Sequence, residues 1–138
     1  MIARAIRQLL ALFGIALIPA IVSGAIQLQF RKPEPLGAGE VRAATVRQWG
    51  DAVLWVDARP RQRFEAGHIP GAVLLNEDEW DALVPEFLDQ WEPEKTIVVY
   101  CDGGTCNASN AVAERLKKEL QVENVFVLKG GIAAWHAR

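Results

Sequence analysis

The feature that most constrains the fold is a run of five β-branched or aromatic residues, Thr96 to Tyr100, which ends at Cys101. A short apolar run without polar alternation is typical of a strand buried on both faces of a parallel sheet. Further apolar runs predict strands at residues 53–57, 72–75 and 125–128. Segments with helical spacing of apolar residues lie between and around the strands, at residues 45–50, 61–66, 77–91, 107–120 and 131–137. This alternation predicts an α/β fold, a parallel sheet flanked by helices on both faces.

Cys101 opens a loop between the predicted strand 96–100 and the predicted helix 107–120, at the edge where sites form in such sheets. Backbone N–H groups in such a loop can converge on an anion, and the helix dipole adds partial positive charge. Both effects favour thiolate over thiol, which a sulfur nucleophile requires. A buried core cysteine is the alternative. Gly103 and Gly104 favour a site, because packing alone does not require so permissive a backbone.

This loop resembles the active-site loop of the rhodanese (sulfurtransferase) family, in which a cysteine opens a six-residue loop at the same junction. Three other segments are similar to that family, in the same order: a strand ending in Asp57-Ala58-Arg59, the Gly-His-Ile-Pro-Gly-Ala sequence at residues 67–72, and the Gly-Gly turn and Ala-Trp helix at residues 130–135. The resemblance implies a rhodanese-like domain over residues 45–138. It also implies that Cys101 takes up a sulfur as a persulfide, with no metal or organic cofactor. The persulfide would be held by the N–H groups of the loop residues Asp102, Gly103, Gly104, Thr105 and Cys106.

Three positions depart from the usual pattern of the family, and one of them is Cys106, where the family often has an arginine or a serine-type residue. Asp102 directly follows the cysteine, and the loop contains no basic residue. A neighbouring carboxylate disfavours the thiolate and repels an anionic donor. Arg63 stands where the family usually has a glutamate. The resemblance therefore carries over the fold and the role of Cys101 more firmly than thiosulfate as the donor.

Cys106 has two interpretations. Cysteines five positions apart across a tight loop can come within the Cα separation of about 4.4–6.8 Å that a disulfide needs. Cys106 would then resolve an adduct on Cys101 by thiol–disulfide exchange. Alternatively, it packs between helix and sheet as a small hydrophobe.

Arg59 and His68 lie near the same edge of the predicted sheet. Arg59 either contacts the substrate and positions the loop, or forms a salt bridge with Asp57 or another carboxylate. His68 is expected to stabilise its turn. The two cysteines and two histidines of the chain lack the spacing of a zinc site, so no metal is expected.

These observations favour a sulfurtransferase that moves sulfane sulfur from a small donor or protein thiol, through Cys101, to a thiol or another nucleophile. One alternative is a thiol–disulfide redox module that uses Cys101 and Cys106 together, with a membrane redox protein as a possible partner. Another is a catalytically silent binding domain that presents the acidic stretch at residues 77–94 to a partner. A cysteine phosphatase is disfavoured, because such enzymes have a larger loop that ends in arginine and position 107 is Asn107.

Residues 9–28 carry no charge and are long enough to cross about 30 Å of hydrocarbon as a helix. We expect residues 1–32 to form a transmembrane anchor, with a cleaved signal segment as the alternative. The Pro- and Gly-containing residues 33–44 are expected to be a tether. Basic groups slightly favour a cytoplasmic N-terminus, which would place the catalytic domain in the periplasm or outside the cell.

The charge of the part beyond the anchor excludes one class of partner. Four of the fifteen Lys and Arg residues lie in the first 32 positions, which leaves eleven against seventeen acidic residues, a net charge of −6. Nucleic acid is therefore not expected as a partner.

Overall fold

The computed structural model describes residues 34–104 and 107–137. Within these residues, five strands form one sheet in the order β1-β5-β4-β2-β3, and every neighbouring pair is parallel. The strands are β1 (Glu40–Val41), β2 (Val53–Asp57), β3 (Val73–Leu74), β4 (Thr96–Tyr100) and β5 (Val125–Leu128). β4 lies in the middle of the sheet, as its mostly apolar sequence predicts.

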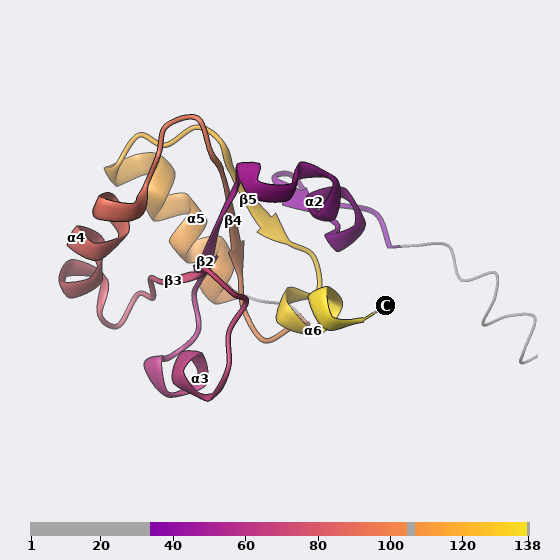
Figure 1. The fold of residues 1–138 in the computed structure, drawn as a ribbon, viewed down its shortest axis with the longest axis horizontal. Helices are drawn as coiled ribbons and strands as arrows, with labels where there is room; N and C mark the ends of the chain where they lie inside the picture. Colours follow the sequence, from indigo (N-terminus) through magenta and orange to yellow (C-terminus); the bar gives the residue numbers. More distant parts are fainter. Residues whose placement is uncertain (1–33, 105–106, 138) are drawn as a thin grey trace, which may run out of the picture. The chain divides into compact units, whose positions relative to one another are not determined.

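Helices cover both faces of the sheet. They are α2 (Ala43–Trp49), α3 (Arg61–Ala66), α4 (Trp80–Gln90), α5 (Asn107–Glu119) and α6 (Gly131–His136), with a short 3₁₀ helix η1 (Gly50–Ala52) after α2. In Figure 1, α4 and α5 lie on one side of the sheet, whereas α2 and α6 lie on the other. The expected α/β architecture, a parallel sheet with helices on both faces, is confirmed.

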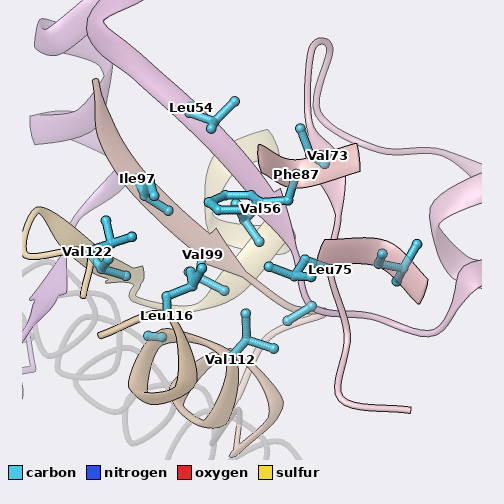
Figure 2. Close-up of a cluster of buried hydrophobic side chains, with 14 of the residues drawn as sticks. Leu54, Val56, Val73, Leu75, Phe87, Ile97, Val99, Val112, Leu116 and Val122 are labelled. Carbon is cyan, nitrogen blue, oxygen red and sulfur yellow. The ribbon is translucent and has the colours of Figure 1, made fainter. Parts of the chain in front are cut away.

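Successive residues of each strand point to opposite faces of the sheet, so the strands contribute to two separate cores. Leu54 and Val56 of β2 belong to the core under α4 and α5, whereas Trp55 belongs to the core under α2 and α6. Phe87 of α4 is fully buried in the first core, and Figure 2 shows its ring beside Val56. β2 is therefore apolar on both faces over most of its length, which explains its nearly unbroken hydrophobic sequence.

Three aromatic rings meet in the second core, beside its aliphatic residues. The ring of Trp55 meets those of Tyr100 and Trp135 edge-on, with centroids 5.9 and 4.7 Å away. Arg47 of α2 stacks over Trp135 and donates hydrogen bonds to the backbone carbonyls of Trp135 and Ala137. These contacts fix α6 against the sheet beside the Cys101 loop.

The main departure from the predicted elements is β1. Glu40 and Val41 pair with Val127 and Leu128 of β5, and α2 begins at Ala43, whereas residues 33–44 were expected to be a tether. Residues from 36 onward belong to one compact unit, which therefore begins before position 45. A two-residue strand has no periodicity of its own, because its stability comes from pairing with β5.

The other boundaries differ by a few residues. The predicted strand at 72–75 is reduced to Val73–Leu74, and the predicted helix at 77–91 is α4, Trp80–Gln90. The segment before α4 is a turn, because the side-chain oxygen of Asn76 accepts a hydrogen bond from the N–H of Glu79 at 2.8 Å. Such side-chain bonds compete with helix formation.

The expected transmembrane anchor, residues 1–32, lies outside the described residues. Among the residues that the structure describes, no helix has the length and apolar character needed to span a bilayer.

Candidate active site at the carboxyl edge of the sheet

Cys101 directly follows β4 and is almost fully buried, with 3 % of its surface exposed. It is disulfide-bonded in this structure. Its backbone carbonyl accepts a hydrogen bond of 2.8 Å from the N–H of Ile132, which ties the start of the loop to the first turn of α6. Thr105 and Cys106, both predicted site residues, lie outside the described residues.

The first part of the loop lies directly on the glycine turn between β5 and α6. A Cβ atom on Gly131 would lie 2.4 Å from the carbonyl oxygen of Cys101 and 2.7 Å from the nitrogen of Gly103. A Cβ atom on Gly103 would in turn lie 3.1 Å from the carbonyl oxygen of Gly130. Only glycine allows this close backbone approach. Gly131 thus belongs to the site, although the sequence showed only a Gly-Gly turn after a strand.

Arg59 lies two residues after the end of β2 and connects this segment to the Cys101 loop. Its side chain is 7 % exposed, and Nε and Nη2 donate to the two carboxylate oxygens of Asp57 at 2.9 and 2.7 Å. Nη2 also donates to the carbonyl of Gly67 at 2.7 Å, and Nη1 reaches Oδ1 of Asp102 at 3.3 Å. The hydrogen bonds that Arg59 donates to Asp57 raise the pKa of Arg59 above its ordinary value, so the guanidinium stays charged. In this geometry Arg59 holds the loop through Asp102.

Asp102 lies between two guanidinium groups. Oδ1 faces Arg59, and Oδ2 lies 4.0 Å from Nε of Arg63 on α3. The side chain of Asp102 is about half exposed, and that of Arg63 is more exposed still. The sequence indicated Asp102 as a repulsive charge beside the sulfur. The structure shows that this charge is paired, through contacts with residues about forty positions earlier in the sequence.

Tyr100 fixes the backbone immediately before the cysteine. Its ring is fully buried, and its hydroxyl oxygen accepts a hydrogen bond of 3.1 Å from the N–H of Ile69. Burial raises the pKa of Tyr100 well above its ordinary value, so the phenol is neutral. The guanidinium carbon of Arg59 lies 5.6 Å from the ring centroid. Tyr100 therefore positions the end of β4 rather than supplying a proton.

His68 stabilises its turn, as the sequence suggests. Its ring stacks on that of Phe64, with centroids 3.9 Å apart, and Nδ1 lies 2.9 Å from the carbonyl oxygen of Phe64. These contacts hold the end of α3 and the following turn together. Among the described residues, no group of three or more acidic, histidine or cysteine side chains is arranged to hold a metal ion.

A cavity of about 240 Å³ reaches the loop at Gly104. Its other walls come from β1, the end of β5 and the first turn of α5, with Glu40, Asn107, Asn110 and Lys129 as the polar residues. The cavity is large enough for a small polar molecule.

The comparison with protein families decides what kind of domain this is. Residues 41–138 match the family model of the rhodanese-like domain. The chain belongs to the rhodanese-like family. The match begins at β1, which agrees with the domain start in the structure rather than with position 45.

Several curated proteins are similar to this rhodanese-like domain. The thiosulfate sulfurtransferase GlpE of Shewanella oneidensis is 33 % identical over 85 residues, which cover 62 % of this chain and 77 % of that protein. The adenylyltransferase and sulfurtransferase UBA4 of Eremothecium gossypii is 30 % identical over 110 residues, and the tRNA uridine(34) hydroxylase of Yersinia enterocolitica is 36 % identical over 81 residues. These alignments cover 75 % and 57 % of this chain. They span only 24 % and 22 % of those two larger proteins.

Solved structures support the same fold. A protein from Bacillus halodurans superposes with a TM-score of 0.58 at 21 % identity, covering 85 % of this chain and 80 % of that one. A rhodanese-related protein from Thermoplasma volcanium has a TM-score of 0.54 at 25 % identity, covering 70 % and 88 %. Rhodanese-like relatives of this chain thus include sulfurtransferases.

Proposed function

We propose that this rhodanese-like domain is a sulfurtransferase in which Cys101 carries the transferred sulfur. The observation that supports this most is the placement of Cys101. It directly follows the central strand β4 and starts a loop packed on the glycine turn at Gly131. The sulfur lies where the topology places reactive groups, and the loop is held by backbone contacts that a merely buried cysteine would not need.

In the proposed reaction, the Cys101 thiolate attacks the outer sulfur of a donor and forms a new S–S bond. The bond within the donor breaks, and its electron pair leaves with the rest of the donor, for example as sulfite from thiosulfate. A nucleophilic acceptor then attacks the outer sulfur of the Cys101 persulfide, and the Cys101 thiolate is regenerated. Because Cys101 is disulfide-bonded here, a thiol reductant must open that bond before the first attack.

The experiment is steady-state transfer of sulfur to cyanide by reduced protein, with thiosulfate and an alkyl persulfide as separate donors. Cys101→Ser is expected to abolish transfer, because a hydroxyl is not ionised at neutral pH. Ser109→Ala of α5, a buried substitution outside the loop, is the control and is expected to retain turnover. More than a tenth of wild-type turnover in Cys101→Ser would remove Cys101 from the proposed role.

The disulfide at Cys101 favours a second candidate, a thiol–disulfide redox module in which Cys106 resolves adducts on Cys101. In that case Cys106→Ala should let a persulfide or mixed disulfide on Cys101 accumulate and should slow turnover with reductants. If Cys106 only packs, the same substitution should leave turnover unchanged and cost about 1 kcal/mol or less of stability. Two measurements separate these outcomes. One is an assay that traps the adduct on Cys101 during turnover, and the other is a thermal melt of the variant.

A third reading is a catalytically silent binding domain. Reduced thiols that neither take up sulfur nor close a disulfide would support it. The acidic stretch at residues 77–94 would then be the surface to test against basic partners.

We further propose that residues 1–32 anchor the domain in a membrane and that the domain faces away from the cytoplasm. The uncharged run at residues 9–28 supports the anchor, and the flanking basic residues support the orientation. An extracytoplasmic location would also suit a disulfide at Cys101. Extraction of membranes at alkaline pH tests the anchor, and a reporter fused to the C-terminus tests the orientation. Release of the protein from the membrane, or a cytoplasmic reporter signal, would contradict these two proposals.

A further inference from the structure

Two guanidinium groups converge beside the Cys101 loop, and one carboxylate of the loop faces both. Oδ1 of Asp102 lies 3.3 Å from Nη1 of Arg59, and Oδ2 lies 4.0 Å from Nε of Arg63. Arg59 lies just after β2 and Arg63 lies in α3, so the carboxylate bridges two separate segments. A doubly charged oxyanion would be attracted to the same two groups.

The charges around this contact cancel. Asp57 is fully buried and pairs with Arg59, while Asp102 lies against the remaining face of Arg59 and against Arg63. Two positive and two negative groups therefore give no net charge beside the sulfur. Without the carboxylate of Asp102, the same group would carry one positive charge.

We propose that Asp102 acts as an internal anion that occupies Arg59 and Arg63, and that it thereby selects singly charged or neutral sulfur donors, such as thiol-derived persulfides, over doubly charged donors such as thiosulfate. This rests on the proposed function, because it concerns the donor of the same cysteine. Arg59 remains fixed by Asp57 and the carbonyl of Gly67 whether or not Asp102 is present. Arg63 is two-thirds exposed and able to turn toward a bound anion.

Removal of the Asp102 charge should raise kcat/KM for a doubly charged donor about tenfold at low ionic strength. Removing one negative charge at about 7 Å from a dianion, in a water-like dielectric, changes the interaction by roughly that factor. Salt of about 0.5 M should reduce the effect to less than about twofold, because the half-exposed site is screened.

The first test does not depend on sulfur transfer. Alkylation of Cys101 is measured in reduced protein that carries Cys106→Ser. The rate with iodoacetate is divided by the rate with iodoacetamide. The two reagents differ by one charge, so changes in thiolate content cancel in the ratio. Asp102→Asn, Arg63→Gln and the double variant form a cycle. Glu65→Gln, which removes a carboxylate from α3 outside this contact, is the control.

We expect Asp102→Asn to raise the iodoacetate-to-iodoacetamide ratio about threefold, since a single charge feels about the square root of the tenfold effect on a dianion. In the Asp102→Asn background, Arg63→Gln should remove at least half of that rise. When Asp102 is present, Arg63→Gln should change the ratio little. Glu65→Gln should leave the ratio nearly unchanged. A ratio that does not move in Asp102→Asn, or that moves equally in Glu65→Gln, would overturn the proposal.

The second test uses the donors themselves. Asp102→Asn should raise kcat/KM for thiosulfate about tenfold and should change kcat/KM for an alkyl persulfide much less. If the persulfide donor places sulfur on Cys101 but Asp102→Asn does not change kcat/KM for thiosulfate relative to the persulfide, the proposed role of Asp102 is wrong. The sulfurtransferase proposal then stands. If no donor places sulfur on Cys101, or neither alkylating reagent reaches it, both proposals fail.

Discussion

The contact between Gly131 and the Cys101 loop leads to a prediction with a built-in control. Gly131 has a φ of +58°, in the left-handed region, and a Cβ atom there would lie 2.4 Å from the carbonyl oxygen of Cys101. Gly71 has a φ of +78°, but a Cβ atom there would meet nothing within 4 Å. Alanine at each position therefore has the same backbone cost, and only Gly131→Ala adds a collision with backbone atoms.

The magnitudes follow from these two terms. A left-handed conformation costs an alanine about 1–2 kcal/mol, so Gly71→Ala should lose that amount of stability. Forcing additional atoms into a packed region costs about 1–3 kcal/mol more, so Gly131→Ala should lose about 2–5 kcal/mol in total. The loop atoms that must move are those beside the nucleophile. Sulfur transfer by the folded fraction of Gly131→Ala should therefore fall about 10–100-fold, whereas Gly71→Ala should retain its rate.

Urea unfolding gives the free energy of unfolding of Gly131→Ala and of Gly71→Ala. The values can be compared when the slope of this free energy against urea concentration is the same as in the wild type. Transfer rates are then measured where both variants are folded. Equal stability losses in the two variants would show that the close approach of Gly131 to the loop does not exist in solution. A normal transfer rate in Gly131→Ala would show that this turn does not position Cys101.

Two further predictions concern the core and the edge strand. Phe87→Ala should lower the free energy of unfolding by about 3–5 kcal/mol, because Phe87 of α4 is fully buried in the first core. Leu88→Ala, at the neighbouring exposed residue, should lower it by about 0.5 kcal/mol or less, and urea denaturation compares the two variants. The Gly37 N–H and the ammonium of Lys129 lower the pKa of Glu40, so its stabilising contribution is present above its ordinary pKa and is lost as the pH falls through the lowered value. Glu40→Gln should therefore speed hydrogen exchange of the Val127 amide, which donates to Gly39, at near-neutral pH, and the difference from wild type should vanish in acid.

The strongly patterned elements could be predicted from the sequence, and the reasons are local. The strands at residues 53–57, 96–100 and 125–128 have the predicted bounds because each is mostly buried on both faces and carries a nearly unbroken apolar run. The two-residue strand β1 was missed because its stability comes from pairing with β5. Leu88 shares the helical spacing of the apolar face of α4 but is 43 % exposed, because it lies at the margin of the buried stripe.

Of the site, the sequence predicted mainly the position of the nucleophile, Cys101. Cys101 was indicated by the strand before it and the glycines after it. The pairing of Asp102 with Arg59 and Arg63 could not be derived, because it depends on how α3 packs beside the loop. The close approach of Gly131 likewise requires the position of α6 in space. Sequence spacing does not encode either distance.

The most direct test of the central claim is the mass of the reduced protein after brief exposure to a sulfur donor and removal of the excess. We predict a mass gain of one sulfur atom, located on Cys101 by fragmentation, which disappears when an acceptor thiol is added. Cys101→Ser should show no gain under the same conditions. A wild-type protein that gains no sulfur, or that carries it only on Cys106, would contradict the account.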